Sequence, residues 1–90
     1  MRKAAKRDTN ERQIINTLDA AGCQVMQISA AGCPDLCVFK PSSGLLRLLE
    51  VKRPKAKLTV AQLESFPHWP VWIVRSPQEA LEAMEIGVTA

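Results

Sequence analysis

A short strand-like segment in the middle of the chain carries charge where an apolar run ends. The segment is Leu45–Lys52, and side chains alternate along a strand, so that Leu48, Glu50 and Lys52 share one face. An amphipathic strand with only a structural role keeps its charges on the opposite face. A carboxylate and an ammonium that extend an apolar stripe therefore indicate a polar site at one end of a sheet.

The preceding strand-like segment begins with a second carboxylate, Asp35. If the Pro-Ser-Ser-Gly turn is a four-residue loop, Lys40 pairs with Leu45, and Asp35 then lies opposite Glu50 with the two Cβ atoms roughly 5 Å apart. At an effective dielectric constant of ~20, two carboxylates at this distance repel by about 3 kcal/mol. Lys52 offsets part of this repulsion. A divalent cation offsets more, since hard carboxylate oxygens suit Mg²⁺ or Mn²⁺. A one-residue bulge would turn one carboxylate away.

Two further polar residues each have a structural explanation that competes with a functional one. Glu11 follows Asp8 by three residues and Gln62 follows Thr59 by three, which are capping-box patterns at helix starts. Glu11 also continues the apolar stripe of its helix, which would point its carboxylate towards the core. From spacing alone, a capping role is favoured for both residues.

The remaining patterns predict one small α/β domain over residues 1–90, with a basic tail at 1–7. Gly22 is a helix stop, proline and glycine clusters separate the strands, and Ser76-Pro77 opens the last helix. The order is α-β-β-β-α-β-α, a central mixed four-stranded sheet flanked by helices. The expected segments are helices at about 9–21 and 59–66 and from Pro77 onwards, and strands at 23–28, 35–39, 45–52 and 71–75.

The charge of the chain is compatible with a polyanionic partner. The formal net charge is +3, and basic residues cluster in two places that suit phosphate groups. A solvated tail and a soluble loop explain the same charges equally well. The candidate nucleic-acid contacts are Lys3, Lys6 and Arg7 in the tail and Arg53, Lys55 and Lys57 after the third strand.

Other classes of protein are disfavoured by composition. No apolar run approaches the ~20 residues of a membrane span, and no signal-peptide pattern is present, so we expect a cytoplasmic protein without a membrane partner. Cys23, Cys33 and Cys37 match no zinc-binding spacing and are expected to be buried free thiols. His68 is expected to be a surface or packing residue, and Trp69 and Trp72 are expected in core or interface packing.

These residues together resemble the PD-(D/E)xK nuclease superfamily, and in particular its virus-type replication-repair nuclease branch, the VRR-NUC domain. The resemblance covers about residues 8–86 and implies a restriction-endonuclease-like fold. In that branch a helix glutamate, a Gly-x-Pro-Asp turn, a Glu-x-Lys strand and a glutamine-bearing helix recur in order. The matching residues here are Glu11, Gly32-Cys33-Pro34-Asp35, Glu50-Val51-Lys52 and Leu58-Thr59-Val60-Ala61-Gln62, followed by a closing strand at 71–76.

The resemblance implies roles for the matched residues. Glu11, Asp35, Glu50 and the main-chain carbonyl of Val51 would hold one or two Mg²⁺ or Mn²⁺ ions, with no small-molecule cofactor. Lys52 would orient or deprotonate the nucleophile or stabilise the transition state. Gln62 would position the phosphate or Lys52.

The expected function is metal-dependent, structure-selective cleavage of DNA in the cytoplasm of a bacterium or a phage-infected host. Compact stand-alone members of the branch resemble homodimeric Holliday-junction resolvases, so a homodimer acting on a four-way junction is favoured. A nuclease for flaps or other branched DNA is an alternative. A non-catalytic DNA-binding module derived from a nuclease, or a structural subunit with surface acids, would explain the same residues without cleavage.

Overall fold

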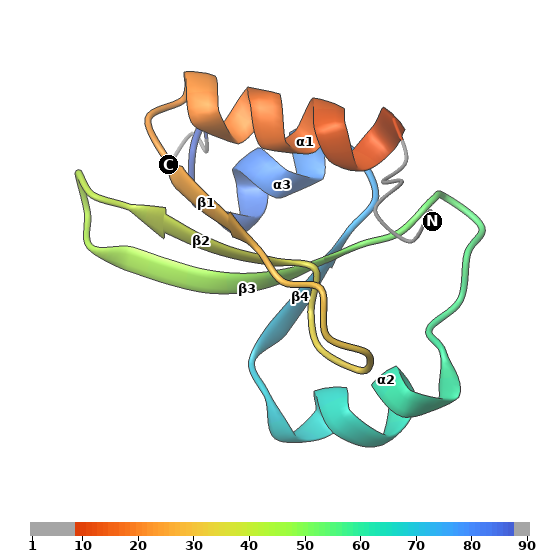
Figure 1. Cartoon of the computed structure of the whole chain (residues 1–90). Coiled ribbons are helices and arrows are strands. Elements are labelled where there is room, and N and C mark those ends of the chain that lie inside the picture. The colour runs from red at the N-terminus through yellow and green to blue at the C-terminus, as the bar shows by residue number, and fades with distance from the viewer. Residues whose placement is uncertain (1–8, 88–90) are drawn as a thin grey trace.

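The computed structural model describes residues 9–87, which form one mixed sheet with helices on both of its sides (Figure 1). The order α-β-β-β-α-β-α predicted from the sequence is confirmed. The basic residues Lys3, Lys6 and Arg7 and the Asp8 cap lie outside the described residues. No helix among the described residues is long and apolar enough to cross a membrane. The elements are α1 (Thr9–Ala20), β1 (Gln24–Gln27), β2 (Leu36–Lys40), β3 (Leu45–Val51), α2 (Val60–Ser65), a 3₁₀ turn (Phe66–His68), β4 (Val71–Val74) and α3 (Pro77–Ala83).

Helix α1 ends in the manner that Gly22 predicts. Gly22 has a φ of 93°, a left-handed conformation that costs glycine little. Its N–H donates to the Asp19 carbonyl at 3.0 Å, and the Cys23 N–H donates to the Leu18 carbonyl at 3.0 Å. This pair of bonds is a Schellman motif, which satisfies the last carbonyls of the helix and directs the chain into β1.

The hairpin between β2 and β3 has the register predicted from its turn. Lys40 pairs with Leu45, and the ladder continues to Leu36 opposite Leu49. The next pair of residues in the same register is Asp35 and Glu50, which therefore lie opposite each other. Strand β1 pairs antiparallel with β2, and β4 pairs parallel with β3, so the strand order is β1-β2-β3-β4. The ends of β3 and β4 therefore lie side by side.

The two faces of the sheet differ in how they are covered. Helices α1 and α3 lie together over one face, while α2 lies on the other side, beside the β1–β2 connection (Figure 1). The covered face holds the core, which combines residues of both helices with alternate strand residues. Its buried members include Ile14 and Leu18 of α1, Ala80 and Ala83 of α3, Met84, and Leu36, Val38, Leu49, Val51 and Val74 of the strands.

The opposite face keeps large apolar side chains at the surface. Met26 is 67 % exposed, Leu46 59 %, Ile73 41 % and Phe39 37 %. Register places Phe39 directly opposite Leu46 and Ile73 beside Glu50. We call Met26, Phe39, Leu46 and Ile73 the open apolar face; it borders the row of the sheet that carries Asp35 and Glu50.

Several local predictions need correction. Strand β2 begins after Asp35, and β3 and β4 end before Lys52 and Arg75. There the Asp35 carboxylate accepts from the Val51 N–H, and the Lys52 and Arg75 carbonyls accept from the Asn10 side chain. The 59–66 helix is shorter and continues as a 3₁₀ turn, since Pro67 has no N–H to extend it.

The cysteines and aromatic residues also differ in part from expectation. Cys23 is a buried free thiol as predicted, but Cys33 is exposed because it lies in a turn, and Cys37 is half-buried on the uncovered side of the sheet. Trp69 and Trp72 lie outside the core, at 60 % and 46 % exposure. Trp72 packs under the Arg47 guanidinium, 4.4 Å from the ring centroid. His68 is at the surface, one of its two expected positions.

Candidate active site

A cleft of about 760 Å³ opens where the β1–β2 connection, the end of β3 and α2 meet. Gly32 in the connection has a φ of 78°, a left-handed conformation that glycine adopts at little cost, and it lies beside α2, where a Cβ would be in ordinary contact with the Ala61 Cβ at 3.4 Å. Residues from distant parts of the sequence thus share one cavity. The predicted site residues Glu11, Asp35, Glu50, Val51, Lys52 and Gln62 all line this cleft, together with Arg53.

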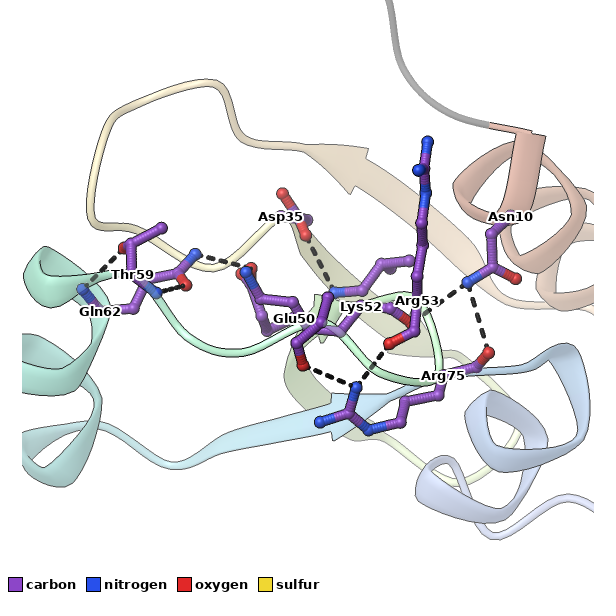
Figure 2. A network of polar contacts seen from close by, with 10 residues as sticks. Asn10, Asp35, Glu50, Lys52, Arg53, Thr59, Gln62 and Arg75 are labelled. Atoms are coloured by element: carbon purple, nitrogen blue, oxygen red, sulfur yellow. Dashed lines mark hydrogen bonds and ion pairs between the residues drawn. The ribbon is translucent and has the colours of Figure 1, made fainter.

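Glu50 is the centre of the polar contacts in the cleft. Its side chain is 2 % exposed, and its Oε2 accepts a hydrogen bond of 2.6 Å from the Gln62 Nε2. The Lys52 Nζ lies 3.4 Å from the same oxygen. The other carboxylate oxygen, Oε1, is buried and has no hydrogen-bond partner among the described residues. Figure 2 shows Gln62 reaching from α2 to this carboxylate.

The environment of Glu50 disfavours its charged form. Burial raises the pKa of the Glu50 carboxyl above its ordinary value, and the nearby Asp35 charge raises it further. The Lys52 ammonium and the Gln62 hydrogen bond act in the opposite direction without reversing the shift. An additional positive charge beside this carboxylate, whether a proton or a cation, would therefore stabilise it.

Asp35 is anchored to the neighbouring strand by its side chain. Its Oδ2 accepts a hydrogen bond of 2.9 Å from the Val51 N–H (Figure 2). Its carbonyl accepts a hydrogen bond of 2.8 Å from the Ile28 N–H. These bonds fix the Asp35 carboxylate at the end of β3, on the row of Glu50. The opposed acid pair predicted from the hairpin is thus brought together by the fold.

Gln62 forms the predicted capping box and also contacts Glu50, whereas its positioning of the phosphate or of Lys52 stays a prediction. Its side-chain Oε1 accepts from the Thr59 N–H at 2.9 Å, and its own N–H donates to the Thr59 Oγ at 3.2 Å, a complete capping box. Its Nε2 remains available to donate to Glu50. The side-chain amide of Gln62 therefore caps α2 through its oxygen and donates to Glu50 through its nitrogen. The position of the helix is thus coupled to the position of the Glu50 carboxylate.

Glu11 lies in the same cleft but apart from the acid pair. It is 6 % exposed, and its Oε2 accepts a 3.4 Å hydrogen bond from the Gln27 Nε2 of β1. Within residues 9–87, no three His, Cys, Asp or Glu side chains are grouped closely enough to form a metal site alone. The fold brings Asp35, Glu50, Lys52 and Gln62 into one constellation and leaves Glu11 at its border.

The acid pair has the donor chemistry of a Mg²⁺ or Mn²⁺ site. Hard carboxylate oxygens are the preferred ligands of these ions, and Mg²⁺ commonly uses only one or two carboxylates with waters and substrate phosphates. The buried Glu50 Oε1 is an oxygen acceptor without a protein partner among the described residues. The residues present therefore fit a divalent ion whose coordination is completed by non-protein oxygens.

The surroundings of the cleft include residues that the sequence did not single out. Arg53, Lys55 and Lys57 follow β3 as exposed basic residues, and their contact with DNA stays a prediction. Asn10 and Arg75 were not identified, yet both donate hydrogen bonds to the main chain beside Lys52 (Figure 2). Neither belongs to a recognisable motif, and only the paired ends of β3 and β4 reveal their position.

Comparison with known proteins agrees with this architecture. The family model of the VRR-NUC domain matches residues 3–67, which include every cleft residue described above. A solved structure of a VRR-NUC domain has 23 % sequence identity and a TM-score of 0.69, and the match covers 87 % of this chain and 92 % of that chain. At this identity the likeness concerns the fold. No curated protein matches the chain. Because the family model spans most of the sequence, the chain belongs to the VRR-NUC family of nuclease domains.

Proposed function

We propose that this domain is a Mg²⁺- or Mn²⁺-dependent, structure-selective DNA endonuclease that hydrolyses phosphodiester bonds. The observation that carries the proposal is the constellation around Glu50: a buried carboxylate with an unpartnered oxygen, an opposed Asp35, and an adjacent Lys52. In a structural subunit whose acidic residues serve only as surface charges, these residues would be exposed to solvent and not buried. The membership of a nuclease family supports the same reading.

Each residue of the constellation has a distinct part in the proposed reaction. Asp35, Glu50 and the Val51 carbonyl would hold the metal, with Glu11 as a further ligand. The chemistry supplied at these oxygens by a bound divalent ion would be a lowered pKa of a bound water and neutralisation of charge on the phosphate. The Lys52 ammonium, 3.4 Å from Glu50, orients the attacking water or donates to the phosphate. Gln62 holds Glu50 in place and leaves its Oε1 for the metal.

DNA is held by the positive charge next to the cleft. Arg53 lines the cleft, and Lys55 and Lys57 are exposed on the same segment. Contacts between these side chains and phosphates release counterions, so binding weakens as salt rises. Lys3, Lys6 and Arg7 add basic charge from the N-terminal end of the sequence.

We further propose that the enzyme is a symmetric homodimer that cuts four-way junctions. The open apolar face supports this: Met26, Phe39, Leu46 and Ile73 are exposed together, which is unusual for a surface that only meets water. A two-fold interface is formed by the same surface patch of both subunits, so an uncharged apolar patch is complementary to itself. Because the patch borders the Asp35 and Glu50 row, such a dimer presents two active sites to two strands.

Cleavage of defined DNA substrates tests the catalytic proposal. Labelled four-way junction, flap, duplex and single strand are incubated with and without Mn²⁺. We expect metal-dependent cutting of the junction, reduced about 10²- to 10³-fold in Lys52→Ala, as when one transition-state donor is removed, and at least as strongly in Asp35→Asn. Flap cutting alone would replace the junction by the flap as substrate. Junction binding without cutting by wild-type protein would indicate the non-catalytic module.

The homodimer is tested separately by sedimentation of Leu46→Lys. Leu46→Lys would bury two lysine charges in the apolar interface of a symmetric dimer, so the variant should be monomeric at concentrations where wild-type protein is dimeric. Val60→Lys is the matched control, because Val60 is also exposed, at 72 %, but lies on α2. A monomeric wild-type protein, or dimers in both variants, would reject this interface.

A further inference from the structure

The parallel strands β3 and β4 end beside the active site, where their ladder leaves carbonyl groups to be satisfied. The last ladder bond runs from the Lys52 N–H to the Val74 carbonyl at 3.0 Å. The next carbonyls, those of Lys52 and Arg75, both accept from the Asn10 Nδ2 at 3.3 Å (Figure 2). One amide of α1 thus joins the ends of both strands, directly at the main chain of Lys52.

The Arg75 side chain holds the segment that follows. Its Nη1 donates to the Arg53 carbonyl at 2.6 Å, to the Ala56 carbonyl at 3.0 Å and to the Pro54 carbonyl at 3.3 Å. The Ala56 N–H closes a turn onto the Arg53 carbonyl at 3.0 Å. Among the described residues, the hydrogen-bond partners of the Arg75 guanidinium are all main-chain carbonyls. The segment therefore wraps around a cation, through bonds that charge makes stronger than neutral ones.

The segment around Arg75 supplies the positive charges that the proposed reaction needs in addition to the acid pair. It starts from Lys52, which lies just beyond the end of β3, and its side chains include Arg53 of the cleft and the exposed Lys55. Because the segment is not a helix or a strand, its shape depends on the Arg75 and Asn10 bonds and on one turn. Small displacements of a catalytic group cost large factors in rate.

We propose that Arg75 and Asn10 are positioning residues, which hold Lys52 and the basic segment 53–57 in register with the acid pair and the DNA backbone. This inference rests on the proposed nuclease function. Arg75 acts on the segment through three carbonyls, and Asn10 acts on Lys52 through its carbonyl. Arg75 therefore controls both substrate binding and turnover, whereas Asn10 controls turnover.

The test compares Arg75→Met with Arg47→Met. Arg47 is a matched control because its guanidinium also donates to a main-chain carbonyl, that of Ala83 at 2.9 Å, but at the other end of β3. For Arg75→Met we expect kcat to fall about tenfold and KM for the junction to rise, because the basic segment loses its anchor. Arg75→Lys should restore part of both, since one ammonium reaches fewer carbonyls. Asn10→Ala should lower kcat with KM unchanged.

A readout without DNA separates this inference from the nuclease proposal. Trypsin cuts after Lys55 and Lys57, and cutting is limited by local opening of the segment. Cleavage there should be about tenfold faster in Arg75→Met than in wild-type protein or Arg47→Met, with thermal melts used to match global stability. If wild-type protein cuts no DNA, the proposed nuclease function is rejected. The trypsin rates still test whether Arg75 holds the segment 53–57 in place. Equal trypsin rates in Arg75→Met and Arg47→Met, or equal kinetic constants in these two variants, would overturn the proposal that Arg75 is a positioning residue.

Discussion

The two faces of the sheet use the same strands for opposite purposes. On the face covered by α1 and α3, the side chains of Leu36, Leu49 and Val74 are almost fully buried in an apolar core. On the other face, the buried side chain at the end of β3 is Glu50, held by Gln62 and Lys52. Further along the same face, Leu46 is 59 % exposed. One face is organised for stability, whereas the other accommodates an unfavourable charge and leaves apolar surface uncovered.

This contrast explains how so small a domain tolerates a strained electrostatic site. The hydrophobic contribution comes almost entirely from the covered face, since exposed apolar side chains gain little from folding. Glu50 is flanked in the strand by Leu49 and Val51, whose side chains belong to that core, while its own side chain is buried on the other face. The covered core therefore offsets the free-energy cost of burying Glu50, and the stability of this core does not depend on the acid site. Substitutions on the two faces should therefore separate stability from activity.

The largest difference is expected from the same substitution on opposite faces of β3. Leu49→Ala should lower the free energy of unfolding by about 2–5 kcal/mol, because it creates a cavity in the core. Leu46→Ala should change it by less than about 0.5 kcal/mol in dilute monomer, as for most surface positions. Urea denaturation monitored by circular dichroism measures both values.

Protein concentration sharpens this comparison. If the open apolar face is covered by a second copy, the cost of Leu46→Ala should appear only at concentrations where wild-type protein is dimeric, because subunit association adds to apparent stability. A cost of several kcal/mol for Leu46→Ala at every concentration would mean that the open face is part of the core of the monomer.

A smaller, pH-dependent effect is expected at Glu50. Because its pKa is raised in the folded protein, the folded state binds more protons than the unfolded state between the ordinary and the raised pKa. Wild-type stability therefore falls as pH rises through this window and stays reduced above it. In metal-free buffer, Glu50→Gln should melt at a higher temperature than wild-type protein at neutral pH, with the gain lost at acid pH.

Metal and an exposed acid provide the controls for this effect. Millimolar Mn²⁺ should raise the melting temperature of wild-type protein more than that of Glu50→Gln, because a ligand that binds the folded state stabilises it. Glu64→Gln, on the exposed side of α2, should melt like wild-type protein at every pH. A Glu50→Gln variant that is less stable than wild-type protein in neutral metal-free buffer would contradict the raised pKa.

The sequence predicted the covered strands and the acid pair because both depend on local rules. The length of one turn set the register that places Asp35 opposite Glu50, and strand alternation added Lys52. Asn10 and Arg75 were missed for a physical reason: they bind carbonyls that become neighbours only when β3 and β4 pair across a long connection. The open apolar face was also missed, since alternation alone does not tell which faces the helices cover.

Gln62 offers the finest separation of structure from chemistry, because its two side-chain atoms have different partners. Thr59→Ala removes the hydroxyl that accepts from the Gln62 N–H and should cost about 1 kcal/mol of stability, as a lost helix cap does, without changing kcat. Gln62→Ala removes the Glu50 contact as well and should lower kcat about tenfold, with a similar stability loss. Melting and cleavage assays on both variants measure the difference. Equal kcat values in the two variants would show that Gln62 starts the helix and does nothing further, whereas a loss confined to Gln62→Ala would place its amide nitrogen in the catalytic constellation.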